Sequence, residues 1–187
     1  MNNTISPNHN GEPGNQILFA TGMCSLGWLL VAVKPTGVCA IALGDAPDNL
    51  TTAFQDKYPE AEFIDGSLEF ERIFAALRQF IDIPEQGLAL TLDTGGTPFQ
   101  QRVWQALREI PVGATASYSE IARRIGSPNS ARAVASACAA NPLAIAIPCH
   151  RVLRIDGKLS GYRWGLERKA ALLRRELLYK KQLIEIG

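Results

Sequence analysis

Two helix-start motifs constrain the fold of this chain more than any other feature of its sequence. In the first, Thr97-Pro98-Phe99-Gln100, a threonine N-cap precedes a proline at the first helical position, and a glutamine stands three residues after the cap. The second, Ser117-Tyr118-Ser119-Glu120, is a capping box of the same kind. Both motifs predict helices, the first ending before residues 111–113 and the second closing at Gly126. A third helix is predicted over residues 130–140.

The second and third of these helices are short and are joined by a glycine-containing turn, as in a helix-turn-helix motif. The second helix of such a motif faces DNA, and here it carries a single charged residue, Arg132. Most of its remaining surface is alanine, which offers few groups for reading base edges. The pattern indicates DNA binding that is largely indifferent to sequence. The alternative is an ordinary packed helical hairpin.

The first half of the chain predicts a small α/β domain. Three apolar runs, over residues 17–21, 28–34 and 37–43, are separated by glycines and a Pro-Thr-Gly turn, which indicates a hairpin or meander. Helices are expected over residues 49–58 and 67–82, of which the second has a well-formed apolar stripe. Another strand is expected over residues 88–93. No catalytic constellation is visible in this half.

The expected domain organisation places a linker at Thr94-Gly95-Gly96. A floppy tail is predicted over residues 1–14, an α/β domain over residues 15–94, and a mainly helical domain over residues 97–187. A chain of 187 residues is long enough to build real cores for two such domains.

Composition excludes several classes of protein. The hydrophobic fraction of 47% and the charged fraction of 20% are those of an ordinary globular protein. No run approaches the ~18 apolar residues that span a bilayer, and the polar N-terminus does not resemble a signal peptide. The 4 cysteines lack paired spacing and there are 2 histidines, so neither a metal site nor a disulfide framework is expected. We therefore expect a cytoplasmic protein without cofactors.

Charge is distributed unevenly along the chain. Residues 1–96 carry 4 Lys/Arg and 12 Asp/Glu, whereas residues 97–187 carry 15 and 6. A contact with a polyanion is therefore expected in the second half. Two alternatives stay open at this point, namely that the halves attract each other or that a solvated helical face is basic.

A cysteine and a histidine stand side by side in Ile147-Pro148-Cys149-His150-Arg151-Val152. The apolar run over residues 143–147 predicts a short buried strand, which Pro148 ends. A thiol is nucleophilic as its thiolate, so Cys149 needs a base or a positive charge nearby, and His150 and Arg151 are candidates. The alternative is that Cys149 is a small buried hydrophobic residue.

The end of the chain predicts a turn over residues 154–158, a loop rich in glycine and aromatic residues over 159–165, and a last helix over about 166–181. Glu176 lies on this helix among arginines and, from the residues alone, reads as a surface ion-pair partner for its neighbours on the helix.

Taken together, Asn141-Pro142, Pro148-Cys149-His150-Arg151-Val152, Gly161-Tyr162 and Gly165-Leu166 resemble the motifs of the O6-alkylguanine-DNA alkyltransferases. The similarity is close over residues 97–176 and looser over 17–96. It implies an α/β fold, with a ribonuclease-H-like first domain followed by a mainly helical winged helix-turn-helix domain. It also implies a monomer that binds double-stranded DNA containing alkylated guanine through the minor groove, flips the damaged base out, and moves its O6-alkyl group onto its own cysteine.

The resemblance also implies a role for individual residues. Cys149 is the expected acceptor, His150 takes its proton through a water, and Glu176 orients His150. Tyr162 is expected to donate a hydrogen bond to the guanine and Asn141 to tie the recognition helix to the active-site turn. The expected DNA contacts are Arg132, which fills the gap left by the flipped base, Tyr118, which crowds the 3′ phosphate, and Ala131 and Ser136 on the same helix; the expected pocket residues are the Val152 carbonyl, the Arg163 N–H and Trp164.

Two departures from the family pattern matter. Larger bacterial members carry a further zinc domain with a second reactive cysteine, and the few residues before residue 15 are not expected to supply it. Trp164 stands where some members have glycine, and its ring is expected to narrow the pocket against benzyl-sized groups.

The predicted function is direct, stoichiometric transfer of methyl from O6-methylguanine, and from O4-methylthymine, to Cys149. The main alternative is a non-catalytic protein that binds alkylated DNA, although such relatives lack the cysteine. A Cys-His hydrolase and a plain helix-turn-helix regulator are further alternatives.

Overall fold

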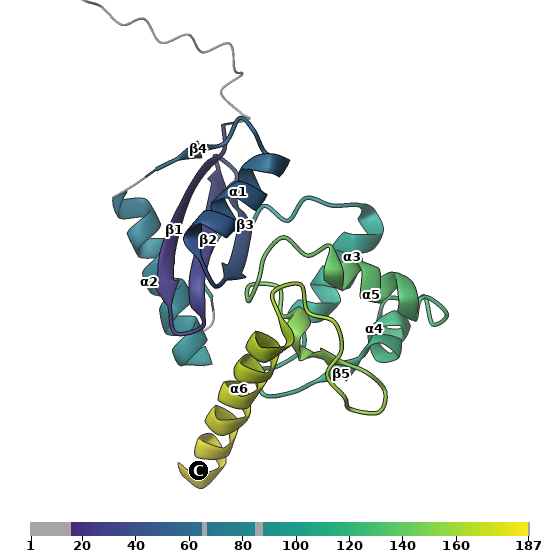
Figure 1. Ribbon diagram of the computed structural model, residues 1–187. Coiled ribbons are helices and arrows are strands. Elements are labelled where there is room, and N and C mark those ends of the chain that lie inside the picture. Colours follow the sequence, from purple (N-terminus) through teal and green to yellow (C-terminus); the bar gives the residue numbers. More distant parts are fainter. Residues whose placement is uncertain (1–15, 65–66, 85–87, 187) are drawn as a thin grey trace, which may run out of the picture.

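The computed structural model describes residues 16–64, 67–84 and 88–186, so the predicted tail over residues 1–14 lies outside the described residues. Three consecutive strands form an antiparallel meander, as the three apolar runs predicted: β1 (Leu18–Cys24), β2 (Gly27–Lys34) and β3 (Gly37–Gly44). A short strand, β4 (Glu62–Phe63), adds parallel to β1 and completes a sheet of order β3-β2-β1-β4 (Figure 1).

The two helices of the first half cover opposite faces of this sheet. Alternate residues of β2 point to opposite sides, so Leu30 packs with Phe54 of α1 (Pro47–Lys57) on one face. Leu29 joins the cluster formed with Leu77 of α2 (Leu68–Asp82) on the other. Both helices were predicted, the second of them from the spacing of its apolar residues, and burial of each large apolar side chain contributes about 1.5–3 kcal/mol.

Two predicted strands are wrong. In the segment of residues 88–93, Leu92 forms a single bridge with Val38, and no longer ladder develops. In the segment of residues 143–147, Leu143 forms one bridge with Ile41, after which the chain turns at Ile145, whose φ is 70°. Each segment was predicted as a strand because it is a short run of mainly apolar residues. Such a run indicates burial, but it does not distinguish a strand from a buried turn.

The second half is mainly helical, as predicted. Both capping boxes are formed, at the starts of α3 (Pro98–Arg108) and α4 (Tyr118–Arg124). The third helix is α5 (Ala131–Ala139), and the last, α6 (Leu166–Ile186), is longer than predicted. Two-residue strands, β5 (Ala116–Ser117) and β6 (Val152–Leu153), pair in parallel between the helices.

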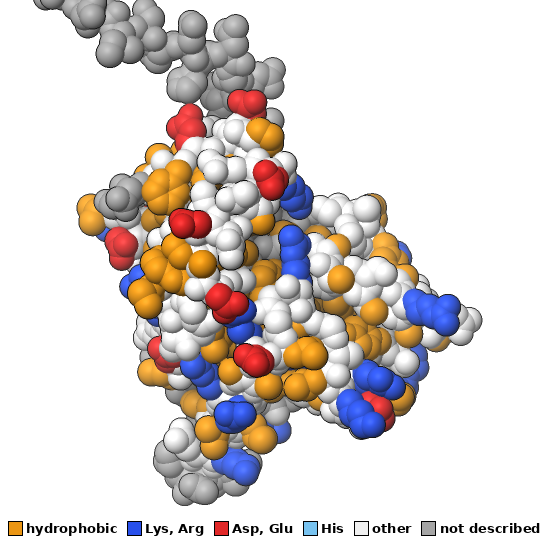
Figure 2. All heavy atoms as spheres, viewed as in Figure 1, with side chains coloured by type: hydrophobic (Ala, Val, Ile, Leu, Met, Phe, Trp, Pro, Cys, Tyr) orange, Lys and Arg blue, Asp and Glu red, His pale blue; other side chains and the backbone are white. Residues whose placement is uncertain are grey.

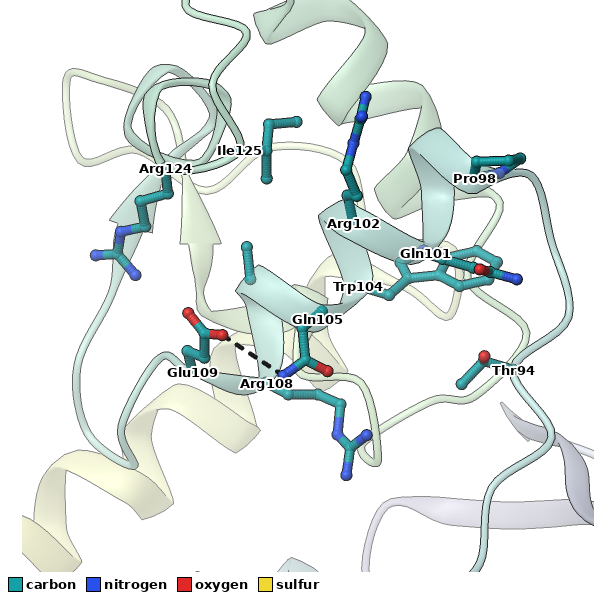
Figure 3. Close-up of a pocket in the computed structure, with 11 residues that line it drawn as sticks. Thr94, Pro98, Gln101, Arg102, Trp104, Gln105, Arg108, Glu109, Arg124 and Ile125 are labelled. Carbon is teal, nitrogen blue, oxygen red and sulfur yellow. Dashed lines mark hydrogen bonds between the residues drawn. The ribbon is translucent and has the colours of Figure 1, made fainter.

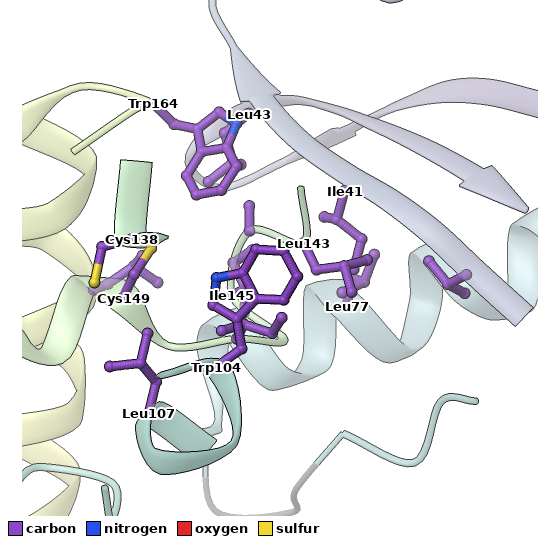
Figure 4. Packing of buried hydrophobic residues seen from close by; sticks show 14 of the residues in the cluster. Ile41, Leu43, Leu77, Trp104, Leu107, Cys138, Leu143, Ile145, Cys149 and Trp164 are labelled. Atoms are coloured by element: carbon purple, nitrogen blue, oxygen red, sulfur yellow. The ribbon is translucent and has the colours of Figure 1, made fainter. Parts of the chain in front are cut away.

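One buried core runs through both halves. Side chains of the sheet and α2, such as Ile41, Leu43 and Leu77, belong to the same cluster as Trp104 of α3 and Leu143 (Figure 4). The backbone reinforces this contact, because Ile41 N donates to Pro142 O at 2.9 Å and Ala144 N donates to Ile41 O at 2.9 Å. The division into domains at residues 94–96 stays a prediction, and the core is shared by residues from both sides of it.

The charge asymmetry of the sequence is visible on the surface. Asp and Glu side chains lie mainly over the first half on the face shown, and Lys and Arg side chains mainly over the second (Figure 2). Some of these charged side chains form ion pairs between the two halves, namely Arg168 with Asp45 and Arg175 with Asp82. Across the described ranges, no helix is both long and apolar enough to cross a membrane.

Candidate active site

Cys149 begins a single 3₁₀ turn, η2 (Cys149–Arg151), directly after Pro148. The turn is closed by Arg151 N donating to Pro148 O at 3.0 Å. This turn follows the left-handed residue Ile145, so the chain changes direction twice within a few residues and delivers Cys149 to the inner side of α5. The thiol is buried, with 4% of the residue exposed.

Asn141 connects α5 to this turn. Its side chain is fully buried, and it both donates and accepts hydrogen bonds. Nδ2 donates to Ile147 O at 2.9 Å and to Cys149 Sγ at 3.3 Å, while Oδ1 accepts from Leu143 N at 2.9 Å. These hydrogen bonds join the end of α5 to the turn that carries Cys149, and the role that the resemblance implies for Asn141 stays a prediction.

His150, Arg151 and Glu176 form a buried charged cluster behind the thiol. His150 Nε2 lies 2.7 Å from Glu176 Oε1, and Arg151 approaches the same carboxylate through Nε at 3.0 Å and Nη2 at 3.0 Å. Gly113 N donates to Glu176 Oε2 at 3.2 Å. Glu176 is therefore not the surface residue that its neighbours on the helix suggested.

The protonation of this cluster follows from its surroundings. Burial opposes ionisation of Glu176, but hydrogen bonds from His150 and Arg151 and the charge of Arg151 outweigh it and lower the pKa of the carboxyl to about 2. Burial lowers the pKa of His150 and keeps the ring neutral, although Glu176 acts in the opposite direction. An ionised carboxylate can only accept a hydrogen bond, so Nε2 carries the ring proton and Nδ1 keeps its lone pair.

His150 Nδ1 and Tyr162 Oη are the buried polar side-chain atoms that have no hydrogen-bond partner among the described residues. Both belong to residues predicted for the site, and their rings meet edge to face with centroids 6.4 Å apart. A basic nitrogen and a phenol that are free to bind a further group are the functions needed for proton removal and for hydrogen bonding to a leaving group.

Cys149 rests as a thiol. Burial raises its pKa to about 11, although the hydrogen bond from Asn141 and the charges of Lys169 and Arg163 act to lower it. Arg151, a candidate from the sequence for this electrostatic role, instead points its guanidinium at Glu176 and at Ile110 O. Arg151 is therefore connected to the Cys149 thiol indirectly, through its ion pair with Glu176 and the contact of Glu176 with His150.

Cys149 opens onto a cavity of about 560 Å³. The wall is formed by the active-site loop (residues 159–165), by α5 and the start of α4, and by Cys149 and Arg154. Its residues are Tyr118, Ala135, Cys138, Ala139, Cys149, Arg154, Ser160, Gly161, Tyr162 and Arg163. Tyr118 Oη and Ser160 Oγ are 3.2 Å apart and tie the start of α4 to this loop. Cys138 is a second thiol in the wall, and burial raises its pKa to about 12.

Two predicted pocket residues lie differently from the expectation. The Trp164 side chain is 6% exposed, belongs to the core shared by both halves, and lines a different, apolar cavity beside α1. It meets Tyr162 edge to face at 5.2 Å, so it borders the Cys149 cavity only through that ring. The Val152 side chain is buried, and its carbonyl accepts a hydrogen bond from Lys169 Nζ at 2.6 Å.

Three of the residues predicted to meet DNA lie on α5. Arg132 and Ser136 are exposed on α5, and Ala131 is half-buried at its start. Ser136 Oγ donates to Arg132 O at 3.2 Å, so the hydroxyl hydrogen of Ser136 is already used in a hydrogen bond within the helix. The helical hairpin is packed by contacts of α5 with both α3 and α4, and it still leaves Arg132 free to reach outward.

A larger cavity, of about 860 Å³, lies elsewhere, between α3 and the end of α4. Figure 3 shows Arg102, Arg108 and Arg124 around it, with Gln105 hydrogen-bonded to Glu109. It contains none of the residues predicted for the site, and it adds to the positive surface of the second half. In the described part of the chain, no group of three or more His, Cys, Asp or Glu side chains is placed to hold a metal ion.

Sequence reasoning missed Lys169, which is fully buried and donates from Nζ to Val152 O at 2.6 Å and to Ser160 O at 2.8 Å. It also missed that Arg151 stabilises the ionised Glu176. The sequence offered one usable indication for Lys169, namely a cationic residue one position before Ala170 on the apolar stripe of α6.

With this geometry established, comparison with known proteins identifies the chain. The family model "6-O-methylguanine DNA methyltransferase, DNA binding domain" matches residues 98–178. The crystal structure of the Mycobacterium tuberculosis O6-methylguanine methyltransferase aligns with a TM-score of 0.74 at 36% identity, covering 88% of this chain and 94% of that chain. The chain belongs to the O6-methylguanine DNA methyltransferase family.

Further relatives of the same family also match this chain. The bifunctional transcriptional activator and DNA repair enzyme Ada of Escherichia coli is 51% identical over 168 residues, which cover 90% of this chain and 47% of Ada. A structure of Mycobacterium tuberculosis OGT in complex with DNA has a TM-score of 0.74 at 35% identity, covering 87% of this chain and 94% of that one. The chain spans about half the length of the curated relatives it matches. The predicted family and fold class are confirmed.

Proposed function

We propose that this protein repairs DNA by transferring the methyl group of O6-methylguanine, and of O4-methylthymine, irreversibly to Cys149 Sγ. The observation that carries the proposal is the buried series Cys149, His150 and Glu176, beside a cavity that Tyr162 also lines. A damaged base is buried within the duplex stack, so it must leave the stack to reach this cavity.

The transfer requires that the Cys149 thiol lose its proton and that the methyl carbon exchange its bond to O6 for a bond to sulfur. A water that bridges to His150 Nδ1 would pass the Cys149 proton to the ring, and the ionised Glu176 would stabilise the imidazolium that forms. The thiolate then attacks the methyl carbon, the S–C bond forms, and the C–O6 bond breaks with its electron pair on O6. Tyr162 Oη donates a hydrogen bond to the departing guanine, whose negative charge it reduces.

Backbone groups at and near Cys149 are proposed to bind the flipped base. The backbone carbonyls of Cys149 and Val152 are assigned to the exocyclic amine and the Arg163 N–H to O6. Because the Val152 carbonyl already accepts from Lys169, the base would use the second lone pair of that oxygen.

The same proposal assigns the duplex to the exposed side of α5. Arg132 would enter the stack where the base has left, and Ala131 and Ser136 would lie against the minor groove, where an alanine-rich surface approaches closely. Tyr118 lies at the junction of α4 and the active-site loop and would crowd the 3′ phosphate. The positive second half supplies affinity independent of sequence.

The product is a thioether, which has no ready leaving step, so each protein molecule acts once. Neither a cofactor nor a second copy of the chain enters this mechanism. The alternative is a protein that binds alkylated DNA without reacting, and the buried thiol with a basic nitrogen near it favours transfer over that alternative.

The proposal is tested by incubating the protein with an excess of duplex that carries radiolabelled O6-methylguanine. Label on the protein should reach a plateau at one equivalent. Binding of the duplex without transfer would favour the non-catalytic alternative, and product beyond one equivalent would point to a hydrolase or another true enzyme.

A further inference from the structure

Arg168, on the first turn of α6, joins the loop just before this helix to two segments of the first half of the chain. Its Nε donates to Leu26 O at 2.9 Å, in the turn between β1 and β2. Nη1 donates to Trp164 O at 2.9 Å, in the active-site loop, and Nη2 binds the Asp45 carboxylate just after β3. One planar guanidinium therefore holds one end of the first-half sheet, where β2 begins and β3 ends, against the loop that carries Tyr162.

The site around Arg168 is shaped for it. The Arg168 side chain is 16% exposed, whereas that of Asp45 is 93% exposed. A Cβ at Gly27, where φ is +106°, would lie 2.6 Å from Gly44 O and 3.2 Å from Arg168 Nη2. The tight turn at Gly27 thus leaves room for the guanidinium, and a side chain there would push against it.

The contact continues from Arg168 to the reacting groups. Trp164, whose carbonyl Arg168 holds, packs its ring edge to face with Tyr162 at 5.2 Å. Tyr162 in turn faces His150 at 6.4 Å between ring centroids, and Gly165 N donates to Tyr162 O at 3.0 Å. Displacement of the Trp164 backbone would therefore be transmitted to the phenol in the Cys149 cavity.

We propose that Arg168 is a positioning residue through which the first half of the chain fixes the active-site loop, residues 159–165, for alkyl transfer. The inference rests on the proposed function. Its consequence is that the first half influences the rate of the chemical step through Leu26 and Asp45, which lie outside the Cys149 cavity and the helix-turn-helix.

Arg175 provides a matched control. It lies two turns further along α6 and also bridges to the first half, with Nη1 donating to Ser25 Oγ at 2.9 Å and to Asp82 Oδ1 at 3.3 Å. Ser25 belongs to the same turn as Leu26. Arg168 and Arg175 thus make comparable contacts between the halves, and of these two Arg168 is the one that also holds the active-site loop through Trp164 O.

The test measures single-turnover transfer from an O6-methylguanine duplex at saturating protein, together with the Kd for that duplex. For Arg168→Ala we expect the transfer rate constant to fall about tenfold with Kd within about twofold of wild type, because misplacement of a reacting group slows chemistry without removing the binding surface. Asp45→Ala should reduce the rate less, about threefold, since its exposed carboxylate is screened by water. Arg168→Lys should not restore the rate, because a lysine ammonium is a compact point charge and cannot reach all three acceptors as the planar guanidinium does.

Arg175→Ala should keep the wild-type transfer rate constant. A wild-type rate for Arg168→Ala, or an equal loss in Arg175→Ala, would overturn the positioning role. If circular dichroism shows that Arg168→Ala does not fold, Asp45→Ala decides, and a wild-type rate in that variant would overturn the role. A wild-type protein that transfers no methyl would instead overturn the proposed function, and the positioning role with it.

Discussion

His150 Nε2 lies 2.7 Å from Glu176 Oε1, across 26 residues of sequence and inside the protein. Because the carboxylate is ionised, this contact fixes the tautomer of the ring and leaves Nδ1 as the basic nitrogen. The same carboxylate neutralises Arg151. One side chain therefore sets both the chemistry of His150 and the stability of the turn that carries Cys149.

Replacement of Glu176 by Gln should impair both properties. The variant leaves the Arg151 guanidinium buried without a counter-charge, so unfolding in denaturant should show a loss of about 3 kcal/mol. Methyl transfer should slow by about 100-fold, because the imidazolium would lose its stabilising charge. Glu167→Gln, on the exposed side of the same helix, is the control and should change neither quantity. Full activity in the Glu176 variant would contradict the assignment.

Stability should depend on pH in a way that identifies Glu176. Its pKa is lowered from 4.5 to about 2 in the folded protein, so the stabilisation is complete above pH 4.5 and is lost as the pH falls towards 2. The size of the loss is about 3 kcal/mol. The lowered pKa of His150 acts in the same direction below 6.5, since the unfolded chain takes up that proton first. In Glu176→Gln the part below pH 4.5 should disappear, and an unchanged pH profile would refute this account.

The thiol of Cys149 should react slowly with iodoacetamide in the absence of DNA. With a pKa of about 11, its alkylation rate, followed by peptide mass spectrometry, should rise about tenfold per pH unit from about pH 8 to about pH 10. Asn141→Ala should slow the reaction further, because the hydrogen bond to Sγ lowers the pKa of the thiol. Cys138 in the same cavity is the internal control. A faster reaction at Cys149 in the variant would argue against this role of Asn141.

Trp164→Gly should increase the rate of reaction with O6-benzylguanine by roughly tenfold, because the Tyr162 ring can move back and make room for the benzyl group. Transfer from O6-methylguanine, which needs no extra room, should slow in the same variant because Tyr162 loses its support. Loss of a buried indole should also cost about 3–5 kcal/mol of stability. Trp164→Phe, which keeps an aromatic edge against Tyr162, should stay close to wild type in all of these measurements. Unchanged reactivity in the glycine variant would show that Trp164 does not limit the size of the alkyl group.

Much of the architecture could be predicted because its information is local. The capping boxes at Thr97 and Ser117 fix helix starts within four residues, and the apolar stripe of α2 repeats at the helical period. Segments 88–93 and 143–147 failed because a short apolar run carries no period that separates a strand from a buried turn. The left-handed residue Ile145, which turns the second segment, has no local sequence signature.

The candidate site divides in the same way. Cys149 and His150 were evident as neighbours in the chain, whereas Glu176 became a candidate through family resemblance alone. The roles of Arg151, Lys169 and Arg168 depend on contacts with Glu176, Val152 and Leu26 that only the folded chain brings together. The position of Trp164 behind Tyr162, instead of in the cavity, likewise depends on the core shared by the two halves.

The central claim is that Cys149 accepts the methyl group. The most direct measurement is peptide mass spectrometry after single-turnover reaction with a duplex in which the methyl of O6-methylguanine carries deuterium, for the wild type and for Cys149→Ala. We predict the labelled methyl on the peptide that contains Cys149, with none on the Cys138 peptide and none on the variant. Label on Cys138, or label that persists in Cys149→Ala, would contradict the account.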